Sequence, residues 1–419
     1  MSKNQIRSIK GTQDILPKES LKWRILEKKI HDTMELFNYG EIRTPAFEKT
    51  ELFDRGVGMQ TDIVTKEMYS WVDQGGESLT LKPELPAPVS RAYIQLSLGI
   101  QKPLTKLYYI AALFRRERPQ KGRFRQFHQY GVEAFGSEHP EIDSEVISIA
   151  VRLFKELGVK DLTLKLNSIG SENCREDYKK ELKKFLKPHL NDLSANSQKR
   201  FETNPLRILD TKSPAEMEII KSAPGISTFW TKEDEEHFKE LCTLLDTLKI
   251  KYTIDSNLVR GLDYYSRTTF EIIAPSLGAQ NAICGGGRYD KLIEMIGGKP
   301  TPGIGFAAGI ERILMSLENY PDSNTIDIFV AGIGPNVRQT VFMVANELRQ
   351  NNLSTECDML RRSIKSQLRE ANKVGASYAI IIGDTELETN SVEVKNLENG
   401  EQEKVAIESI VNHMTSLSF

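Results

Sequence analysis

The chain has 419 residues, and its 56 Lys and Arg against 58 Asp and Glu leave a formal net charge of −2. This length predicts two or three domains, and the 39% hydrophobic and 27% charged residues are typical of a globular protein. The sequence offers neither a membrane span of roughly 20 apolar residues nor an N-terminal apolar signal segment. The near-zero charge excludes a uniformly basic coat protein, but it allows a nucleic-acid partner bound through a local basic patch.

The cysteines are too far apart to form a recognisable framework. The four are Cys174, Cys242, Cys284 and Cys357. Their spacing fits neither a disulfide scaffold nor a CxxC metal site, so we assign no residue as a metal ligand. It is typical of a protein in a reducing compartment, and we expect the cytoplasm.

The first part of the chain, residues 1–169, alternates helical and strand signals. Apolar residues at helical spacing predict one helix that ends near Tyr39 and another over Ser144–Leu157. The strand-like runs between them are Glu41–Phe47, Ser78–Leu81, Lys106–Phe114 and Phe127–Phe135. Because strands follow one another without a helix between each pair, an antiparallel sheet is favoured over a doubly wound parallel one.

The remaining chain divides by composition into three parts. Residues 170–252 are rich in Lys and Glu and interrupted by proline, which predicts a helical insertion. Residues 253–321 return to strand signals, at Arg267–Ala274, followed by two Gly-rich runs. After a polar linker at 320–325, strands and helices alternate through residues 326–419, which predicts a separate α/β domain.

The most cationic stretch is FRRERPQKGRFRQFHQYGVE, residues 114–133. Between Arg115 and Arg125 it holds six cations and one anion, Glu117, around a Pro-Gln-Lys-Gly turn. Such a basic hairpin loop suits phosphate, because arginine presents a planar fork of donors. The alternative is a solvated charge run.

Two details favour a phosphate-and-base site in this hairpin. Phe124 and Phe127 are interleaved with the cations and are able to stack on a base. Gln129 and Glu133 follow at even spacing, so their side chains share one face of the strand.

Four other stretches are weak signals when each is taken alone. Arg260, in LVRGLDYYSRTTFE, lies among aromatic residues, which more often indicates a surface cation–π pair than a catalytic group. CGGGRYD (284–290) alone predicts a turn, and GIGFAAGIER (303–312) lacks the features of a P-loop or a dinucleotide site. Glu84, in KPELPAP, is either a buried carboxylate for an ammonium group or an exposed loop residue.

Taken together, these motifs resemble those of class II aminoacyl-tRNA synthetases, and specifically of the histidyl-tRNA synthetase family. IRTPAFE (42–48) is similar to the first class motif, whose proline, here Pro45, lies at the dimer interface. FRRERPQKGRFRQFHQ resembles the second motif and GIGFAAGIER the third, while LVRGLDYY and GGGRYD resemble two signatures peculiar to histidyl enzymes. The resemblance covers essentially the whole chain.

The resemblance implies an α+β fold with a class II catalytic domain, an antiparallel sheet flanked by helices. It also implies that the helical insertion clamps tRNA and that the C-terminal α/β domain binds the anticodon. The implied activity is activation of L-histidine by ATP and Mg²⁺, followed by transfer to tRNA(His), in a homodimer without membrane attachment.

Individual roles carry over by position. The implied ATP-binding residues are Arg115, Glu117, Arg123, Phe127 and Arg312. The implied histidine-binding residues are Glu84, Leu85, Pro86, Gln129, Glu133, Arg260, Tyr264 and Tyr265. Arg115 and Arg260 form the implied catalytic pair, since both contact the α-phosphate.

The chemistry of the residues agrees with these roles. A carboxylate nucleophile is already ionised at neutral pH, so its attack on phosphate needs positioning and cations rather than a strong base. Neutral imidazole offers one donor and one acceptor, which Glu133 and a tyrosine hydroxyl complement. A site built on such buried hydrogen bonds rejects other amino acids without an editing domain.

One residue departs from the family pattern, and one alternative function stays open. The family usually has threonine where this chain has Pro86, which lacks a hydroxyl and is expected to hold Leu85 in an extended conformation. The alternative is a synthetase-like, histidine-binding regulatory subunit of ATP phosphoribosyltransferase that does not charge tRNA. Such paralogues typically lack the anticodon domain and have eroded ATP motifs, neither of which this sequence shows.

Overall fold

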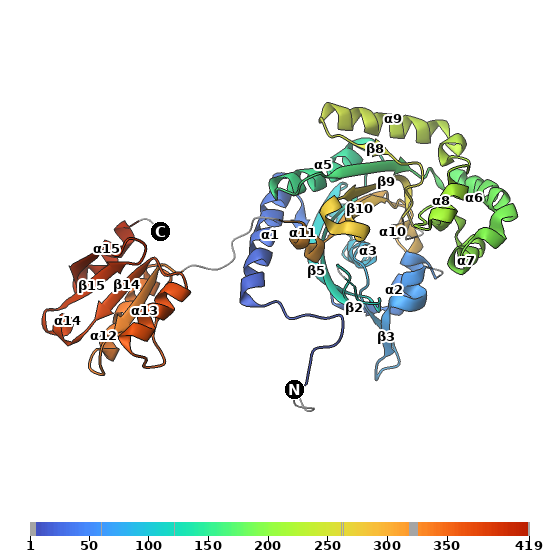
Figure 1. Ribbon diagram of the computed structural model, residues 1–419. Helices are drawn as coiled ribbons and strands as arrows, with labels where there is room; N and C mark the ends of the chain where they lie inside the picture. Colours follow the sequence, from blue (N-terminus) through green and yellow to red (C-terminus); the bar gives the residue numbers. More distant parts are fainter. Residues whose placement is uncertain are drawn as a thin grey trace. The chain divides into compact units, whose positions relative to one another are not determined.

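The computed structural model describes residues 6–59, 61–120, 122–260, 262, 264–317 and 326–417. The chain divides into two compact units: most of the chain up to residue 320 belongs to the first, and the C-terminal part from residue 321, together with Leu16–Lys22, belongs to the second (Figure 1). The linker expected at 320–325 lies outside the described residues. No helix in the described ranges is long and apolar enough to cross a membrane.

An eight-stranded sheet forms the centre of the larger unit. Its strands, in spatial order, are β1 (Gly40–Glu41), β5 (Thr105–Phe114), β6 (Gln126–Phe135), β11 (Gly303–Gly309), β10 (Ala282–Arg288), β9 (Ser266–Ile273), β7 (Thr163–Ser168) and β8 (Thr253–Ile254). The strands from β5 to β7 pair antiparallel. The predicted antiparallel sheet is therefore confirmed, although the short edge strands β1 and β8 run parallel to their neighbours.

Four helices pack on one face of this sheet, the closed face. They are α1 (Pro17–Leu36), α5 (Pro140–Glu156), α9 (Lys232–Thr247) and α11 (Ile310–Ser316). Because strand residues alternate between faces, Tyr130 and Val132 of β6 enter this core, where they join Leu26 of α1 and Ile149 of α5. The side chains at odd positions of β6 consequently face the other way.

The opposite face is bordered by shorter elements that leave its middle open. These are α3 (Pro86–Gln95), α10 (Leu292–Met295) and a helical segment that contains α6 (Glu172–Leu186), η3 (Lys187–Asp192), α7 (Ala195–Thr203), η4 (Pro205–Ile208), α8 (Pro214–Ile220) and η5 (Ile226–Phe229). Val89 of α3, Tyr178 of α6 and Leu292 of α10 belong to one apolar cluster with Tyr109 of β5. Figure 1 shows the helical segment at the edge of the unit.

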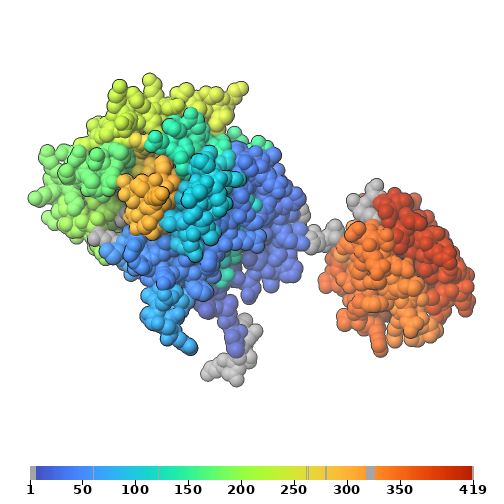
Figure 2. Space-filling model, turned by 180° about the vertical axis from the view of Figure 1, so that it is seen from behind, coloured from blue at the N-terminus to red at the C-terminus, as the bar shows by residue number. Residues whose placement is uncertain are grey.

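A small sheet projects from the larger unit, as both Figure 1 and Figure 2 show. It consists of β2 (Phe47–Lys49), β4 (Ser78–Leu81) and β3 (Tyr69–Val72), in that order. Between β2 and β3 lie α2 (Thr50–Phe53) and two π-helical turns, η1 (Asp54–Gly58) and η2 (Ile63–Glu67). The connections α4 (Leu98–Gln101) and η6 (Pro275–Gln280) complete the unit.

Two predicted elements are wrong. Glu41–Phe47 is not one strand, because β1 ends at Glu41, β2 begins at Phe47, and the chain between them contains Pro45, which has no N–H for a strand ladder. The CGGGRYD run is not a turn, since residues 282–288 form strand β10 inside the sheet. Glycine normally indicates a turn, and here it marks a place where other groups approach the strand closely.

The smaller unit is an α/β layer structure, as the alternation of patterns predicts. Its sheet has the order β13 (Thr355–Cys357), β12 (Ile328–Gly332), β14 (Tyr378–Ile382), β15 (Ser391–Asn396) and β16 (Gln402–Ala406). The first three strands are parallel and the last two antiparallel. Its helices are α12 (Arg338–Gln350), α13 (Ile364–Lys373), α14 (Asp384–Glu388), η7 (Ile407–Ser409) and α15 (Ile410–Ser416).

A buried ion pair ties β10 to the helices of the closed face. Arg288 and Asp143 are both fully buried, with Nη2 2.7 Å from Oδ1 and Nε 3.0 Å from Oδ2. Arg288 also donates to Asp290 and to the carbonyl oxygens of Ser137 and His139. This pair fixes the end of the strand that carries the GGGRYD motif.

We expect Asp143→Ala to destabilise the larger unit by ~3–5 kcal/mol, because it leaves the Arg288 charge buried without its main partner. Urea unfolding followed by circular dichroism measures the change. Asp32→Ala is the matched control, since it removes an exposed carboxylate paired with Lys28 and should have little effect. Equal losses in the two variants would contradict this role for the buried pair.

Candidate functional site

The middle of the open face has almost no side chains. Strand pairing places Gly131 of β6 opposite Ala307 of β11, and Ala307 opposite Gly285 of β10. In the next row Gly305 lies between Glu133 and Gly287. Since these residues share one face, they form a shallow floor on which larger groups from the rim are able to lie.

Three of the floor glycines each leave room for a particular functional group. A Cβ atom added at Gly285 would overlap the guanidinium of Arg260, and one at Gly305 would overlap the carboxylate of Glu133. One at Gly131 would overlap the hydroxyl of Tyr109. The glycines therefore allow an arginine, a carboxylate and a phenol to lie directly against the backbone of the sheet.

Arg260 lies over this floor, held by neighbours on two sides. Its Nη1 donates to Glu271 Oε1 of β9 at 3.0 Å, and its guanidinium carbon is 5.9 Å from the Tyr265 ring centroid. Its side chain is only 22% exposed and Tyr265 is buried, so this is not a surface cation–π pair. Arg175 of α6 donates to the Tyr265 carbonyl, which braces the tyrosine against the helical segment.

Glu84 is a buried carboxylate, and the exposed-loop alternative is wrong. It is 3% exposed; Oε1 accepts from the Ala87 N–H at 2.9 Å and Oε2 accepts from the Tyr264 hydroxyl at 3.0 Å. Burial, the largest cause, raises the pKa of Glu84 to about 7, and the two hydrogen bonds oppose that rise. This group is poised between its charged and neutral forms near neutral pH.

Pro86 begins helix α3, and the expected extended conformation of Leu85 is wrong. Proline suits the first helical position, where no N–H donor is needed. Leu85 has φ −118° and ψ −26°, because the Glu84–Ala87 hydrogen bond closes a turn around it. The proline disfavours this conformation but does not forbid it, and the Leu85 side chain is buried.

Glu133 occupies a pocket of phenols that differs from the predicted one. Oε1 accepts from the Tyr109 hydroxyl at 2.9 Å, Oε2 accepts from the Tyr289 hydroxyl, and the residue is fully buried. Burial raises the pKa of Glu133 well above its usual range. Tyr264 bonds Glu84 instead, although the Tyr264 and Tyr289 ring centroids are 5.6 Å apart.

Sequence reasoning missed Tyr109 and Tyr289 as site residues. Tyr289 belongs to the GGGRYD motif, so this motif could have indicated it as a site residue. Tyr109 lies opposite Gly131 in the β5–β6 pairing, and only the three-dimensional register reveals that its hydroxyl reaches Glu133. Gln129, which was predicted, lies on the same face between Ala111 and Gly309 and is half-buried.

The basic loop 115–125 joins β5 to β6 beside this floor. The Arg115 guanidinium donates from Nε to the Pro83 carbonyl at 2.8 Å and lies 5.2 Å from the Phe127 ring centroid. Glu117 is near both Arg115, at 3.8 Å, and Arg123, at 3.1 Å. One carboxylate thus orients two of the predicted phosphate-binding arginines, which argues against a merely solvated charge run.

Arg312 of α11 approaches the same loop from the other side. Its Nε donates to the Gly122 carbonyl at 3.1 Å and Nη1 donates to the Ala282 carbonyl at 2.8 Å. Burial and the neighbouring positive charge of Arg123 lower the pKa of Arg312. Three arginines therefore converge on a region with a surplus of positive charge, as a polyphosphate requires.

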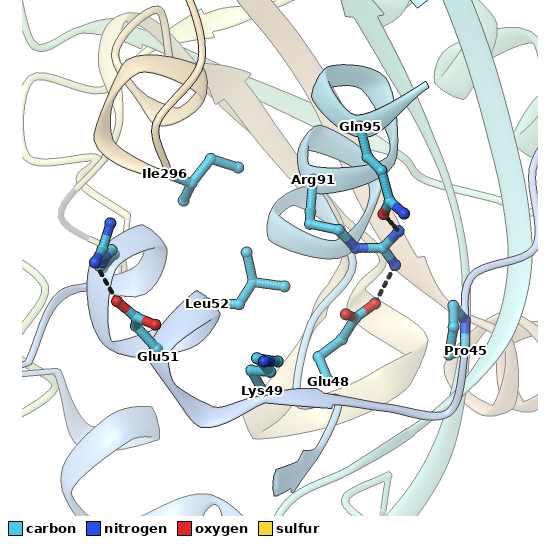
Figure 3. A pocket seen from close by; sticks show the side chains of 9 residues that line it. Pro45, Glu48, Lys49, Glu51, Leu52, Arg91, Gln95 and Ile296 are labelled. Carbon is cyan, nitrogen blue, oxygen red and sulfur yellow. Dashed lines mark hydrogen bonds and ion pairs between the residues drawn. The ribbon is translucent and has the colours of Figure 1, made fainter. Parts of the chain in front are cut away.

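Of two pockets, one lies apart from these residues and one adjoins them. A pocket of about 580 Å³ is lined by Pro45, Glu48, Lys49, Glu51, Leu52, Arg55, Arg91, Gln95 and Ile296 (Figure 3). Its charged groups are largely paired, Arg91 with Glu48 and Arg55 with Glu51. A smaller one, of about 120 Å³, adjoins Arg260 and Tyr265.

In the described ranges, no three His, Cys, Asp or Glu residues are grouped as a metal site.

An antiparallel sheet whose open face carries arginines from a hairpin loop and from a final strand–helix pair is the catalytic fold of class II aminoacyl-tRNA synthetases. The sequence profile of the histidyl-tRNA synthetase family matches residues 11–313, and the profile of the anticodon binding domain family matches residues 327–417. The chain belongs to the histidyl-tRNA synthetase family.

Similar proteins extend over the full length. A histidine–tRNA ligase of Acetivibrio thermocellus is 47% identical over 97% of this chain and 98% of its own length, and one of Halothermothrix orenii is 47% identical over 98% and 99%. Apo histidyl-tRNA synthetase of S. aureus has a TM-score of 0.84 at 37% identity, covering 98% of this chain and 100% of that one.

One structural neighbour bears on the regulatory alternative. A protein from Bacillus halodurans described as an ATP phosphoribosyltransferase regulatory subunit/histidyl-tRNA synthetase has a TM-score of 0.66 at 21% identity, covering 91% of this chain and 99% of that one. This likeness shows a shared fold alone.

The raised pKa of Glu84 predicts a pH-dependent affinity for an ammonium ligand. Below about pH 7 the carboxyl is protonated and cannot pair with an ammonium group, so affinity should rise as the pH rises through 7. Calorimetric Kd values across this range, with L-histidine as the probe ligand, measure the change.

Glu84→Gln is the matched control for this pH dependence. It should bind weakly and lose the component near pH 7, keeping only the titration of the imidazole at about pH 6.5. An unchanged pH profile in Glu84→Gln would exclude Glu84 as the titrating group.

Proposed function

We propose that this chain activates L-histidine with ATP to form histidyl-adenylate and transfers the histidyl group to the 3′ end of tRNA(His). One observation carries the proposal: Arg260 and Glu133 lie against the glycine floor, and the buried Glu84 accepts from Tyr264, whose ring packs against the Tyr289 that donates to Glu133. Each of the three groups has the charge or hydrogen-bonding capacity for a different part of histidine. The family membership of the whole chain supports the same activity.

The amino-acid side of the site divides among three groups. Glu84 and Gln129 receive the ammonium, and Arg260 receives the carboxylate. Glu133 accepts the imidazole N–H, and a tyrosine hydroxyl of the surrounding cluster donates to the unprotonated ring nitrogen. Leu85 and Pro86 form the turn across which the Ala87 N–H holds the Glu84 carboxylate.

The ATP side uses the basic loop and Arg312. Arg115 binds the α-phosphate, Arg123 and Arg312 bind the outer phosphates, and Phe127 stacks on adenine after Arg115 leaves its ring. Glu117 keeps Arg115 and Arg123 apart and oriented until the phosphates arrive. With Arg115 and Arg260 on the α-phosphate, the developing negative charge meets preorganised cations.

Mg²⁺ enters this reaction with ATP and would neutralise phosphate charge. The residues fit a phosphate-held ion, because Mg²⁺ typically uses one or two carboxylates, several waters and substrate phosphates. Glu117 and Glu271 are the carboxylates beside the arginines, and each is now ion-paired, to Arg123 and Arg260 respectively. Binding of the phosphates to the arginines would free both carboxylates for the ion.

The regulatory-subunit alternative is less supported. The chain retains the arginines proposed to bind ATP, Arg115, Arg123, Arg260 and Arg312, and its C-terminal unit matches an anticodon binding domain. A protein that only sensed histidine would have no need of either feature.

We further propose a cytoplasmic homodimer formed through the projecting small sheet. Phe47 and Trp71 lie on one face of that sheet, are 50% and 41% exposed, and have ring centroids 6.0 Å apart. Pro45, two residues before Phe47, lines the pocket in Figure 3. Exposed aromatic residues in one patch are typical of a protein interface.

The decisive experiment is pyrophosphate–ATP exchange with each common amino acid. We expect exchange with L-histidine, and its absence would contradict the proposed function and favour the regulatory alternative. In the same assay Arg260→Ala should lower the adenylation rate by ~10²–10³, the usual loss when one preorganised donor to a developing oxyanion is removed. Near-normal single-turnover adenylation in this variant would remove Arg260 from the mechanism.

A truncation tests the division of labour between the two units. A chain that ends at residue 320 retains every residue of the proposed adenylation site, so it should still support histidine-dependent exchange. It should aminoacylate tRNA(His) poorly, because it lacks the unit proposed to contact the anticodon. Charging by the truncated chain at the full-length rate would contradict that assignment.

A further inference from the structure

The N-terminal segment forms a tight turn that the proposed mechanism leaves unused. The Thr12 N–H and the Thr12 hydroxyl both donate to the Ile9 carbonyl, at 2.9 and 2.8 Å. Gly11, the third residue of this turn, has φ +93°, a conformation that a type II turn requires at this position and that favours glycine. Ile6 and Ile9 are 98% and 69% exposed, so these side chains do not add to a core.

This turn contacts the basic loop directly. The Arg125 N–H donates to the Gly11 carbonyl at 2.7 Å. A Cβ atom at Gly11 would lie 2.8 Å from Pro119 Cγ and 2.9 Å from Arg125 Cγ, both closer than ordinary contacts. The glycine therefore serves two purposes, since it permits the turn and lets the turn approach the loop.

Arg125, which contacts the turn, is also hydrogen-bonded to the backbone of Arg115. The Arg115 N–H donates to the Arg125 carbonyl at 2.9 Å, so Arg125 bridges the turn and the first residue of the loop. On the other side, Arg312 holds the loop through the Gly122 carbonyl. The loop is thus fixed between two supports, of which only Arg312 belongs to the proposed ATP site.

We propose that the turn 9–12 positions the ATP-binding loop, with Gly11 as a positioning residue for Arg115 and Arg123. This inference rests on the proposed ATP site and extends it to a segment that does not touch the reacting groups. Displacing the turn shifts the loop backbone, and the phosphate-binding arginines shift with it, whereas the histidine-binding groups on the floor stay in place.

The test compares full-length Gly11→Ala with Gly158→Ala. Gly158 also has a positive φ, +73°, but no atom lies within 4 Å of an added Cβ, so this control carries the backbone strain without the overlap. In pyrophosphate exchange we expect Gly11→Ala to lose about ten- to a hundredfold in kcat/KM for ATP, as small misplacements of binding groups do. The histidine KM and the melting temperature should match those of Gly158→Ala.

A chain that begins at Gln13 gives a second, strain-free variant, and it should show the same loss toward ATP. If kcat/KM for ATP in both variants equals that of Gly158→Ala, the inference is overturned. Equal rises in the ATP and histidine KM, with a melting temperature below that of the control, would also overturn it, because they indicate a general structural role. Absence of exchange by the wild-type chain would instead count against the proposed function.

Discussion

The proposed active site depends on one steric constraint, the absence of side chains in the middle of the sheet. Gly131, Gly285 and Gly305 leave the backbone bare, and Arg260, Glu133 and Tyr109 fill the space that Cβ atoms would take. A methyl group at any of these positions would lift a functional group off the floor. Strand register places Glu133 and the floor glycines, while Glu84 and Arg260 come from the connections before α3 and β9 and are held by hydrogen bonds to Tyr264 and Glu271.

The charged groups above this floor restrain one another. Glu271 holds Arg260, Glu117 holds Arg115 and Arg123, and backbone carbonyls hold Arg312. Such partners keep the arginines near their working positions and lessen the repulsion among like charges. When phosphates bind, the arginines exchange ion pairs with Glu117 and Glu271 for ion pairs with the phosphates. The affinity for ATP therefore reflects the difference in free energy between these two sets of ion pairs.

The parts of this structure that follow local rules could be predicted from the sequence, and the parts that depend on distant contacts could not. The alternation around the basic loop predicted the β5–β6 hairpin, because charge and periodicity are local properties. The sequence predicted a turn where strand β10 lies, because sequence alone does not distinguish glycines that make room for Arg260 and Glu133 from glycines in a turn. The hydrogen bond between Tyr109 and Glu133 depends on register across 24 residues, which spacing alone does not reveal.

The two buried acids of the amino-acid site have a thermodynamic consequence. Burial raises the pKa of both Glu84 and Glu133, and the negative charge of Glu84 raises the pKa of Glu133 further. Near neutral pH the empty site therefore holds part of a proton on Glu84, and an arriving ammonium group would displace it into solution. The measured heat of histidine binding would then contain the protonation enthalpy of the buffer, and it would differ between buffers even where the affinity is the same.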